Sequence, residues 1–146
     1  MSINLKHLFH RLFTLLAIST LFFTGCGSSG PGIHPVKGQV QLVGGDSSPL
    51  VGHLVEIAKA DDQQVRASGE IKTDGKFQLE SLRDGKISSG TVAGKYLARI
   101  VLSDDDPQAR QTAAAAIHPR FLKFNSSGLT VEVPSNGEVE LQVSRQ

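Results

Sequence analysis

The stretch KYLARIVL, residues 95–102, decides the fold class because it is a long apolar run that alternates as a β-strand does. Successive side chains of a strand point to opposite faces. Tyr96 and Ile100 therefore share one face with Ala98, and Leu97 and Val101 lie on the other. The pattern predicts a strand whose Tyr96 face belongs to the core.

Turn residues divide the rest of the chain into short segments with the same two-residue period. Glycine, proline and Asp-Gly pairs mark the turns, and Asp74-Gly75 predicts a tight hairpin into the next strand. The further predicted strands are Val36–Val43, His53–Lys59, Val65–Ile71, Phe77–Leu79, Leu129–Val133 and Val139–Val143. With residues 95–102 they predict an all-β fold, a seven-stranded antiparallel β-sandwich.

One segment, residues 107–116, has a helical pattern. Asp106 can accept hydrogen bonds from the first free backbone amides, Pro107 suits the first helical position, and the alanines that follow favour helix. The acidic run Asp104-Asp105-Asp106 could instead collect Ca²⁺, although it lacks the alternating spacing of a calcium loop. We expect a helix cap, and the sequence leaves calcium binding open.

The N-terminal 25 residues have the layout of a bacterial signal peptide. Lys6 and Arg11 precede an apolar stretch over residues 12–23, which is too short to cross a bilayer as a helix. Thr24-Gly25-Cys26 then resembles the cleavage site of bacterial lipoproteins. The resemblance implies that residues 1–25 are removed and that Cys26 receives a diacylglycerol. Ordinary cleavage near Gly25, with a free thiol on Cys26, is the alternative.

The residues after Cys26 suggest how the protein is attached and where. Residues 26–35 are rich in glycine and serine, and we expect them to form a flexible tether between the membrane and a domain over residues 36–146. No aspartate follows Cys26, and the lipoprotein resemblance then implies the outer membrane, with the domain facing the periplasm or the exterior.

The composition argues against a nucleic-acid-binding protein and against an internal disulfide. The chain has 146 residues, of which 39% are hydrophobic and 20% charged, and its formal net charge is +1. These values are typical of a globular domain and give no footprint for nucleic-acid binding. A single cysteine cannot form an internal disulfide.

Several motifs together resemble the carboxypeptidase regulatory-like, or transthyretin-like, domain of small bacterial lipoproteins. They are Pro49-Leu50-Val51-Gly52, Thr73-Asp74-Gly75-Lys76-Phe77, Gly94-Lys95-Tyr96, Ile117-His118-Pro119-Arg120-Phe121 and the segment Ser126–Val133. The resemblance covers nearly all of the chain after Cys26 and implies a β-sandwich. The family supplies no catalytic residue, and residues 104–116 match none of its features.

Candidate catalytic and metal-binding residues fail on geometry or spacing. His53 and Glu56 match the His-x-x-Glu letters of zinc carboxypeptidases, but residues three apart in a strand point to opposite faces. His34 and His118 have no partner at metal-ligand spacing. No serine lies in a Gly-x-Ser-x-Gly motif. We therefore expect no metal, no cofactor and no catalytic site.

Four aromatic residues follow Cys26. Phe77 and Tyr96 occupy inward strand positions and are expected in the core. Phe121 and Phe124 lie in a loop-like stretch next to Arg120. We expect them to cover one end of the sandwich, and a partner-binding edge is the alternative.

The sequence favours a non-catalytic, lipid-anchored envelope β-sandwich that acts as an interaction or structural module. The membrane is its expected partner through Cys26, and no protein partner can be named. A small-ligand-binding subunit would require a pocket with convergent polar groups. A transthyretin-like hydrolase is disfavoured because histidines and arginines do not cluster in the sequence.

Overall fold

Strand β9 (Gly94–Val101) forms where the KYLARIVL pattern predicts it, in a computed structural model that describes residues 31–145. It pairs antiparallel with β3 (Leu54–Lys59) on one side and with β10 (Thr130–Val133) on the other. Tyr96, Ala98 and Ile100 are buried, whereas Leu97 and Val101 are partly exposed. The predicted core face of this strand is confirmed.

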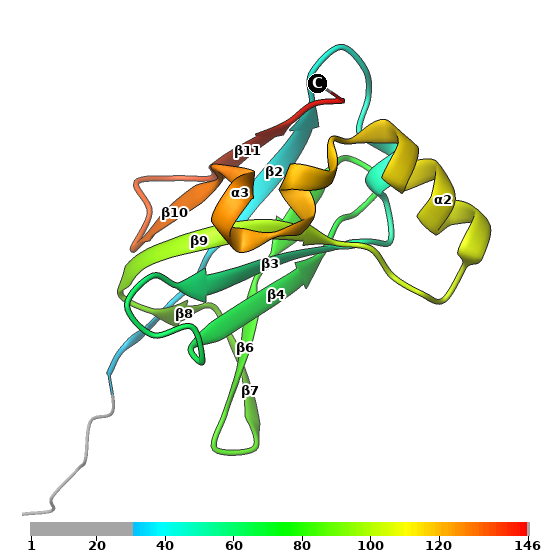
Figure 1. The fold of residues 1–146 in the computed structure, drawn as a ribbon. Helices are drawn as coiled ribbons and strands as arrows, with labels where there is room; N and C mark the ends of the chain where they lie inside the picture. Colours follow the sequence, from blue (N-terminus) through cyan, green and yellow to red (C-terminus); the bar gives the residue numbers. More distant parts are fainter. Residues whose placement is uncertain (1–30, 146) are drawn as a thin grey trace, which may run out of the picture. The chain divides into compact units, whose positions relative to one another are not determined.

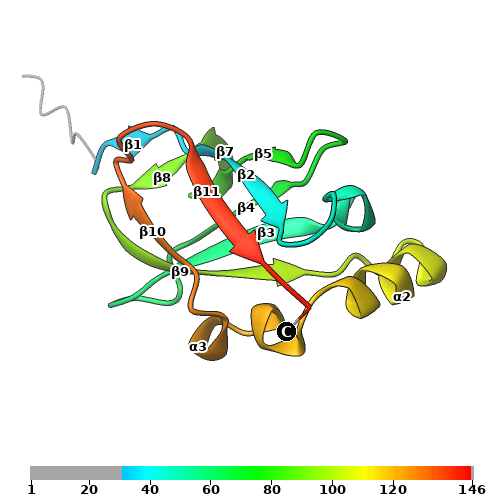
Figure 2. The same ribbon diagram turned by 90° about the horizontal axis from the view of Figure 1, so that it is seen from above.

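The described strands form three sheets (Figures 1 and 2). The largest has the order β10-β9-β3-β4-β6-β7, in which β4 is Arg66–Glu70, β6 is Glu80–Arg83 and β7 is Lys86–Ser89. The second has the order β11-β2-β5, with β11 at Val139–Val143, β2 at Lys37–Leu42 and β5 at Lys76–Gln78. The third pairs β1 (Ile33–His34) with β8 (Thr91–Val92).

A single hydrophobic core joins the two larger sheets. The inward side chains of β2 and β11, including Val40 and Leu141, belong to the same buried cluster as Ile57 of β3 and Tyr96 of β9. Figure 2 shows β2 and β11 in one layer and β3 and β9 in the other. The all-β sandwich predicted from the sequence is confirmed.

Three details of the predicted sandwich differ from the structure. The described residues contain eleven strands rather than seven, and β11 runs parallel to β2, so the sandwich is not wholly antiparallel. The turn at Asp74-Gly75 forms, with the Gly75 N–H donating to Lys72 O (2.8 Å), but it is not the predicted hairpin. It leads from β4 of one sheet to β5 of the other, because β5 pairs with β2.

The β6–β7 hairpin is an element that the sequence analysis did not predict. Its turn residues Asp84 and Gly85 both have positive φ (50° and 74°), as a type I′ turn requires. Its alternation gives no core signal in the sequence because the apolar residues Leu82 and Ile87 face solvent. In Figure 1 the hairpin projects below the sandwich.

The start of the described chain is more ordered than predicted. Ile33 pairs with Val92 and His34 with Thr91, so part of the expected flexible tether, residues 33–34, is a strand. The chain therefore enters the domain at a defined place beside β8.

The helix predicted over residues 107–116 is confirmed as α2 (Pro107–Ala116). One carboxylate oxygen of Asp106 accepts hydrogen bonds from the N–H groups of Gln108 (2.8 Å) and Ala109 (3.1 Å), and Ala113 is buried against the core. Three shorter helical segments also occur: η1 (Ser48–Leu50), η2 (Pro119–Leu122) and α3 (Phe124–Ser127). Within residues 31–145, no helix is both long and apolar enough to cross a membrane.

Replacing Asp106 by alanine is expected to lower the free energy of unfolding by about 0.5–2 kcal/mol, because two helix amides lose their acceptor. Urea denaturation measures the change. Asp104→Ala is the matched control, and its cost should be no more than about 1 kcal/mol because its ion pair with Arg110 is at the surface. Equal losses in the two variants would contradict the capping role.

Candidate functional site

Cys26, the predicted lipidation site, lies outside the described residues. The described segment nearest to it in the sequence is the start of the described chain. Pro31 and Gly32 lie there beside a hollow of about 340 Å³. The hollow is also lined by His34, Lys59, Val65, Arg83, Val92 and Ala93. We call this the entry hollow.

The entry hollow has a basic lining. His34, Lys59 and Arg83 come from β1, β3 and β6, and none of the residues that line the hollow is acidic. Lys59 Nζ also lies 3.2 Å from Asp61, whose side chain is 75% exposed. The Lys59 side chain itself is only 23% exposed, so water screens this pair mainly through the exposed Asp61. The arrangement fits an anionic group such as a phosphate.

A second charged cluster lies on the outer face of the large sheet. The Glu56 carboxylate accepts from Arg99 through Nε (2.7 Å) and lies 2.6 Å from its Nη2, and it lies 3.2 Å from Arg66 Nη1. Both guanidinium groups also lie over the Phe124 ring, at 4.6 Å for Arg99 and 5.5 Å for Arg66. This cluster holds α3 against the sheet and commits its charges to one another.

The prediction that Phe121 and Phe124 cover one end of the sandwich is wrong for Phe124, whose ring lies on the outer face of the large sheet. Phe121 is buried, and the guanidinium of Arg120 lies 4.5 Å from its ring centre. Phe124 is half-buried under Arg66 and Arg99. Phe77 and Tyr96 are both in the core, which confirms the prediction for those two residues.

His53 and Glu56 lie on opposite sides of the strand, as the spacing predicted. His53 is 2% exposed, and its Nδ1 accepts from the Ser103 N–H (3.1 Å). A nitrogen that accepts carries no proton, so Nε2 carries it. Nε2 is buried and has no hydrogen-bond partner among the described residues. His53 thus joins β3 to the loop before α2 and does not face solvent.

The three aspartates before α2 each contact a different group and do not converge on one point. Asp104 pairs with Arg110 (2.6 Å), Asp105 accepts from the Ser103 hydroxyl (2.7 Å), and Asp106 caps the helix. Among residues 31–145, no group of three or more histidine, cysteine, aspartate or glutamate side chains has a geometry suited to a metal ion. His34 lies in β1, and His118 Nδ1 accepts from the Arg120 N–H (3.1 Å) at the start of η2.

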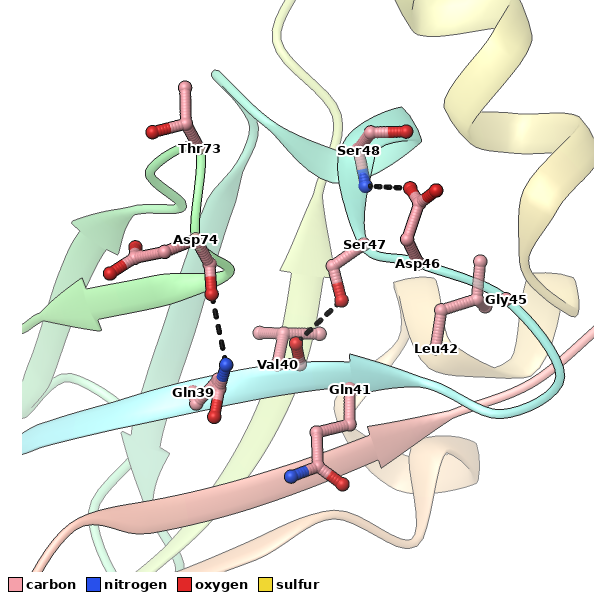
Figure 3. Close-up of a pocket in the computed structure, with 10 residues that line it drawn as sticks. All are labelled: Gln39, Val40, Gln41, Leu42, Gly45, Asp46, Ser47, Ser48, Thr73 and Asp74. Atoms are coloured by element: carbon pink, nitrogen blue, oxygen red, sulfur yellow. Dashed lines mark hydrogen bonds between the residues drawn. The ribbon is translucent and has the colours of Figure 1, made fainter.

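A shallow polar groove of about 480 Å³ lies between the end of β2, the following loop and the Asp74 turn (Figure 3). Its polar groups hold the loops in place. Ser47 donates to Val40 O (2.7 Å), Gln39 donates to Asp74 O (2.9 Å), and the Ser48 N–H donates to Asp46 (2.8 Å), as Figure 3 shows.

The hydrogen bonds from Ser48, from its side chain and its backbone, hold the pKa of Asp46 below the ordinary carboxyl value. Their contribution is present at neutral pH and is lost only as the pH falls through that lowered pKa. The groove is therefore built from the residues that close the loop after β2. Its hydrogen bonds stabilise that loop.

The chain was compared with family models, with curated proteins and with solved structures, and none of them matches it. The arguments about function therefore rest on the residues and the geometry. The feature that sequence reasoning missed is the entry hollow, because His34, Lys59 and Arg83 are far apart in the sequence. The Asp84-Gly85 pair was the one local signal that could have indicated the hairpin beside it.

Proposed function

We propose that this protein is a lipid-anchored component of a bacterial cell envelope, attached through Cys26, whose β-sandwich is a non-catalytic interaction or structural module. The apolar stretch followed by Thr24-Gly25-Cys26 carries the proposal. The fold of residues 31–145, a β-sandwich, is the fold that the family resemblance implies for such a module. The sequence motifs favour a carboxypeptidase regulatory-like sandwich that is anchored to the outer membrane.

Two polar arrangements on the described surface serve the fold. The serine, aspartate and glutamine side chains of the groove in Figure 3 hold its loops. The charges of Glu56, Arg66 and Arg99 are committed to one another.

The proposal is tested by growing cells with an alkyne-bearing fatty acid and measuring its incorporation into the protein. The wild-type chain should carry the label, and Cys26→Ala should lose it completely because the acceptor thiol is gone. Ser28→Ala keeps the thiol and is the matched control, which should be labelled as the wild type is. Label that persists in Cys26→Ala, or that is absent from the wild type, would contradict lipid attachment at Cys26.

A further inference from the structure

The tip of the β6–β7 hairpin exposes an apolar pair that nothing in the domain covers. Leu82 and Ile87 face each other across the hairpin, and they are 71% and 72% exposed. Val43 is the other large apolar residue that is strongly exposed in the described chain, and it lies beyond the end of β2. The hairpin is therefore the place where two such side chains form one patch.

The hairpin also carries two cations. Arg83 pairs with Lys86 in the register, next to the turn and on the face opposite to Leu82 and Ile87. Asp84 lies in the turn itself, and Glu80 lies farther from the tip. Long basic side chains beside an apolar pair can reach lipid headgroups while the pair enters the interface.

The hairpin lies beside the place where the tether leaves the domain. Arg83 lines the entry hollow together with Pro31 and Gly32, the first two described residues. Figure 1 shows the hairpin projecting on the same lower side of the sandwich on which the described chain begins. Five residue steps separate Cys26 from Pro31, and a fully extended chain covers at most about 18 Å in that number of steps.

We propose that the hairpin tip is a second membrane contact, in which Leu82 and Ile87 enter the interface of the bilayer that holds the Cys26 lipid, while Arg83 and the entry hollow face the headgroups. The proposal rests on lipid attachment at Cys26. The short tether keeps the tip close to that bilayer, so the tip meets the lipids at a high effective concentration and the contact does not need high affinity. The contact fixes the orientation of the domain on the membrane.

The reach of the tether and the basic entry hollow favour a bilayer over a protein partner. The short tether limits how far this side of the domain can lie from the membrane. Lys59 and Arg83 give the hollow positive charge and no acidic residue lines it, so it complements anionic headgroups. Partial burial of each apolar side chain favours the contact by about tenfold.

The test uses the full lipidated chain in vesicles of phosphatidylethanolamine and phosphatidylglycerol. The lipid occupies the Cys26 thiol, so a cysteine introduced by Ser89→Cys is the one site for a fluorophore. Ser89 is exposed and alternates onto the same hairpin face as Leu82 and Ile87. Gln111→Cys on the exposed side of α2 is the matched control.

Nitroxide-bearing lipids should quench the label at position 89 several-fold more strongly than the label at position 111. Adding Leu82→Ser and Ile87→Ser should remove most of this difference, since the contact loses about tenfold for each apolar side chain. Val43→Ser removes an exposed apolar side chain elsewhere and should leave the difference unchanged. Circular dichroism melting checks that all these surface variants remain folded.

Each remaining outcome counts against the proposal in a different way. Protein that floats with the vesicles but is quenched equally at positions 89 and 111 would overturn the hairpin contact and leave the anchor standing. Quenching that survives the double serine change would also overturn it. Energy transfer between labels on two copies would show that the tip binds a second copy. Protein that fails to float would refute the anchor and the hairpin contact together.

Discussion

Replacing Tyr96 by alanine is expected to lower the free energy of unfolding by about 3–5 kcal/mol. The ring is 1% exposed and lies in the core that joins the two larger sheets. Its hydroxyl donates to Val92 O (2.8 Å) and lies 3.1 Å from the Thr91 hydroxyl. Urea denaturation of the unlipidated Cys26→Ser chain measures the loss.

Tyr96→Phe is the matched control, because it keeps the ring and removes the hydroxyl. It should cost about 1 kcal/mol, the net value of a typical hydrogen bond. A loss of less than about 1 kcal/mol in Tyr96→Ala would mean that the ring does not fill the core. Equal losses in the two variants would assign the whole effect to the hydroxyl.

Replacing Gly90 by alanine is expected to cost about 2–5 kcal/mol, because strain and a clash add together. The backbone at Gly90 has φ +110°, a conformation that residues with a Cβ rarely adopt. An added Cβ would also collide with the backbone of His34 and Pro35. This is where the entering chain passes β7, so the variant should also loosen β1 from β8.

Gly52→Ala is the control that separates backbone strain from the steric clash. Gly52 also has positive φ (81°), but an added Cβ would meet no atom within 4 Å. The control should therefore cost only the strain of about 1–2 kcal/mol. Denaturation curves that show equal losses at positions 52 and 90 would contradict the close approach of the two backbone segments.

Local patterns in the sequence predicted most elements of the domain. The helix begins at the predicted residue because Asp106 and Pro107 are strong start signals and act on their own neighbours. The strand over residues 95–102 was predictable because its alternation is long. The parallel pairing of β11 with β2 was not, since it joins segments about 100 residues apart and leaves no local mark.

The β6–β7 hairpin was not predicted from the sequence, because its apolar side chains do not face the core. Alternation indicates a strand when the apolar side chains face the core, but Leu82 and Ile87 face outward and Ser81 lies on the buried side. The resulting pattern resembles a turn between strands and not a strand. Likewise, the entry hollow forms only when β1, β3 and β6 are brought together, so no motif could predict it.

The mass of the N-terminal peptide of the protein purified from membranes tests the central claim most directly. The account predicts a peptide that begins at Cys26, lacks residues 1–25 and carries the added mass of a diacylglyceryl group on the cysteine. A peptide with an unmodified Cys26 thiol, or one that begins at another residue, would contradict it.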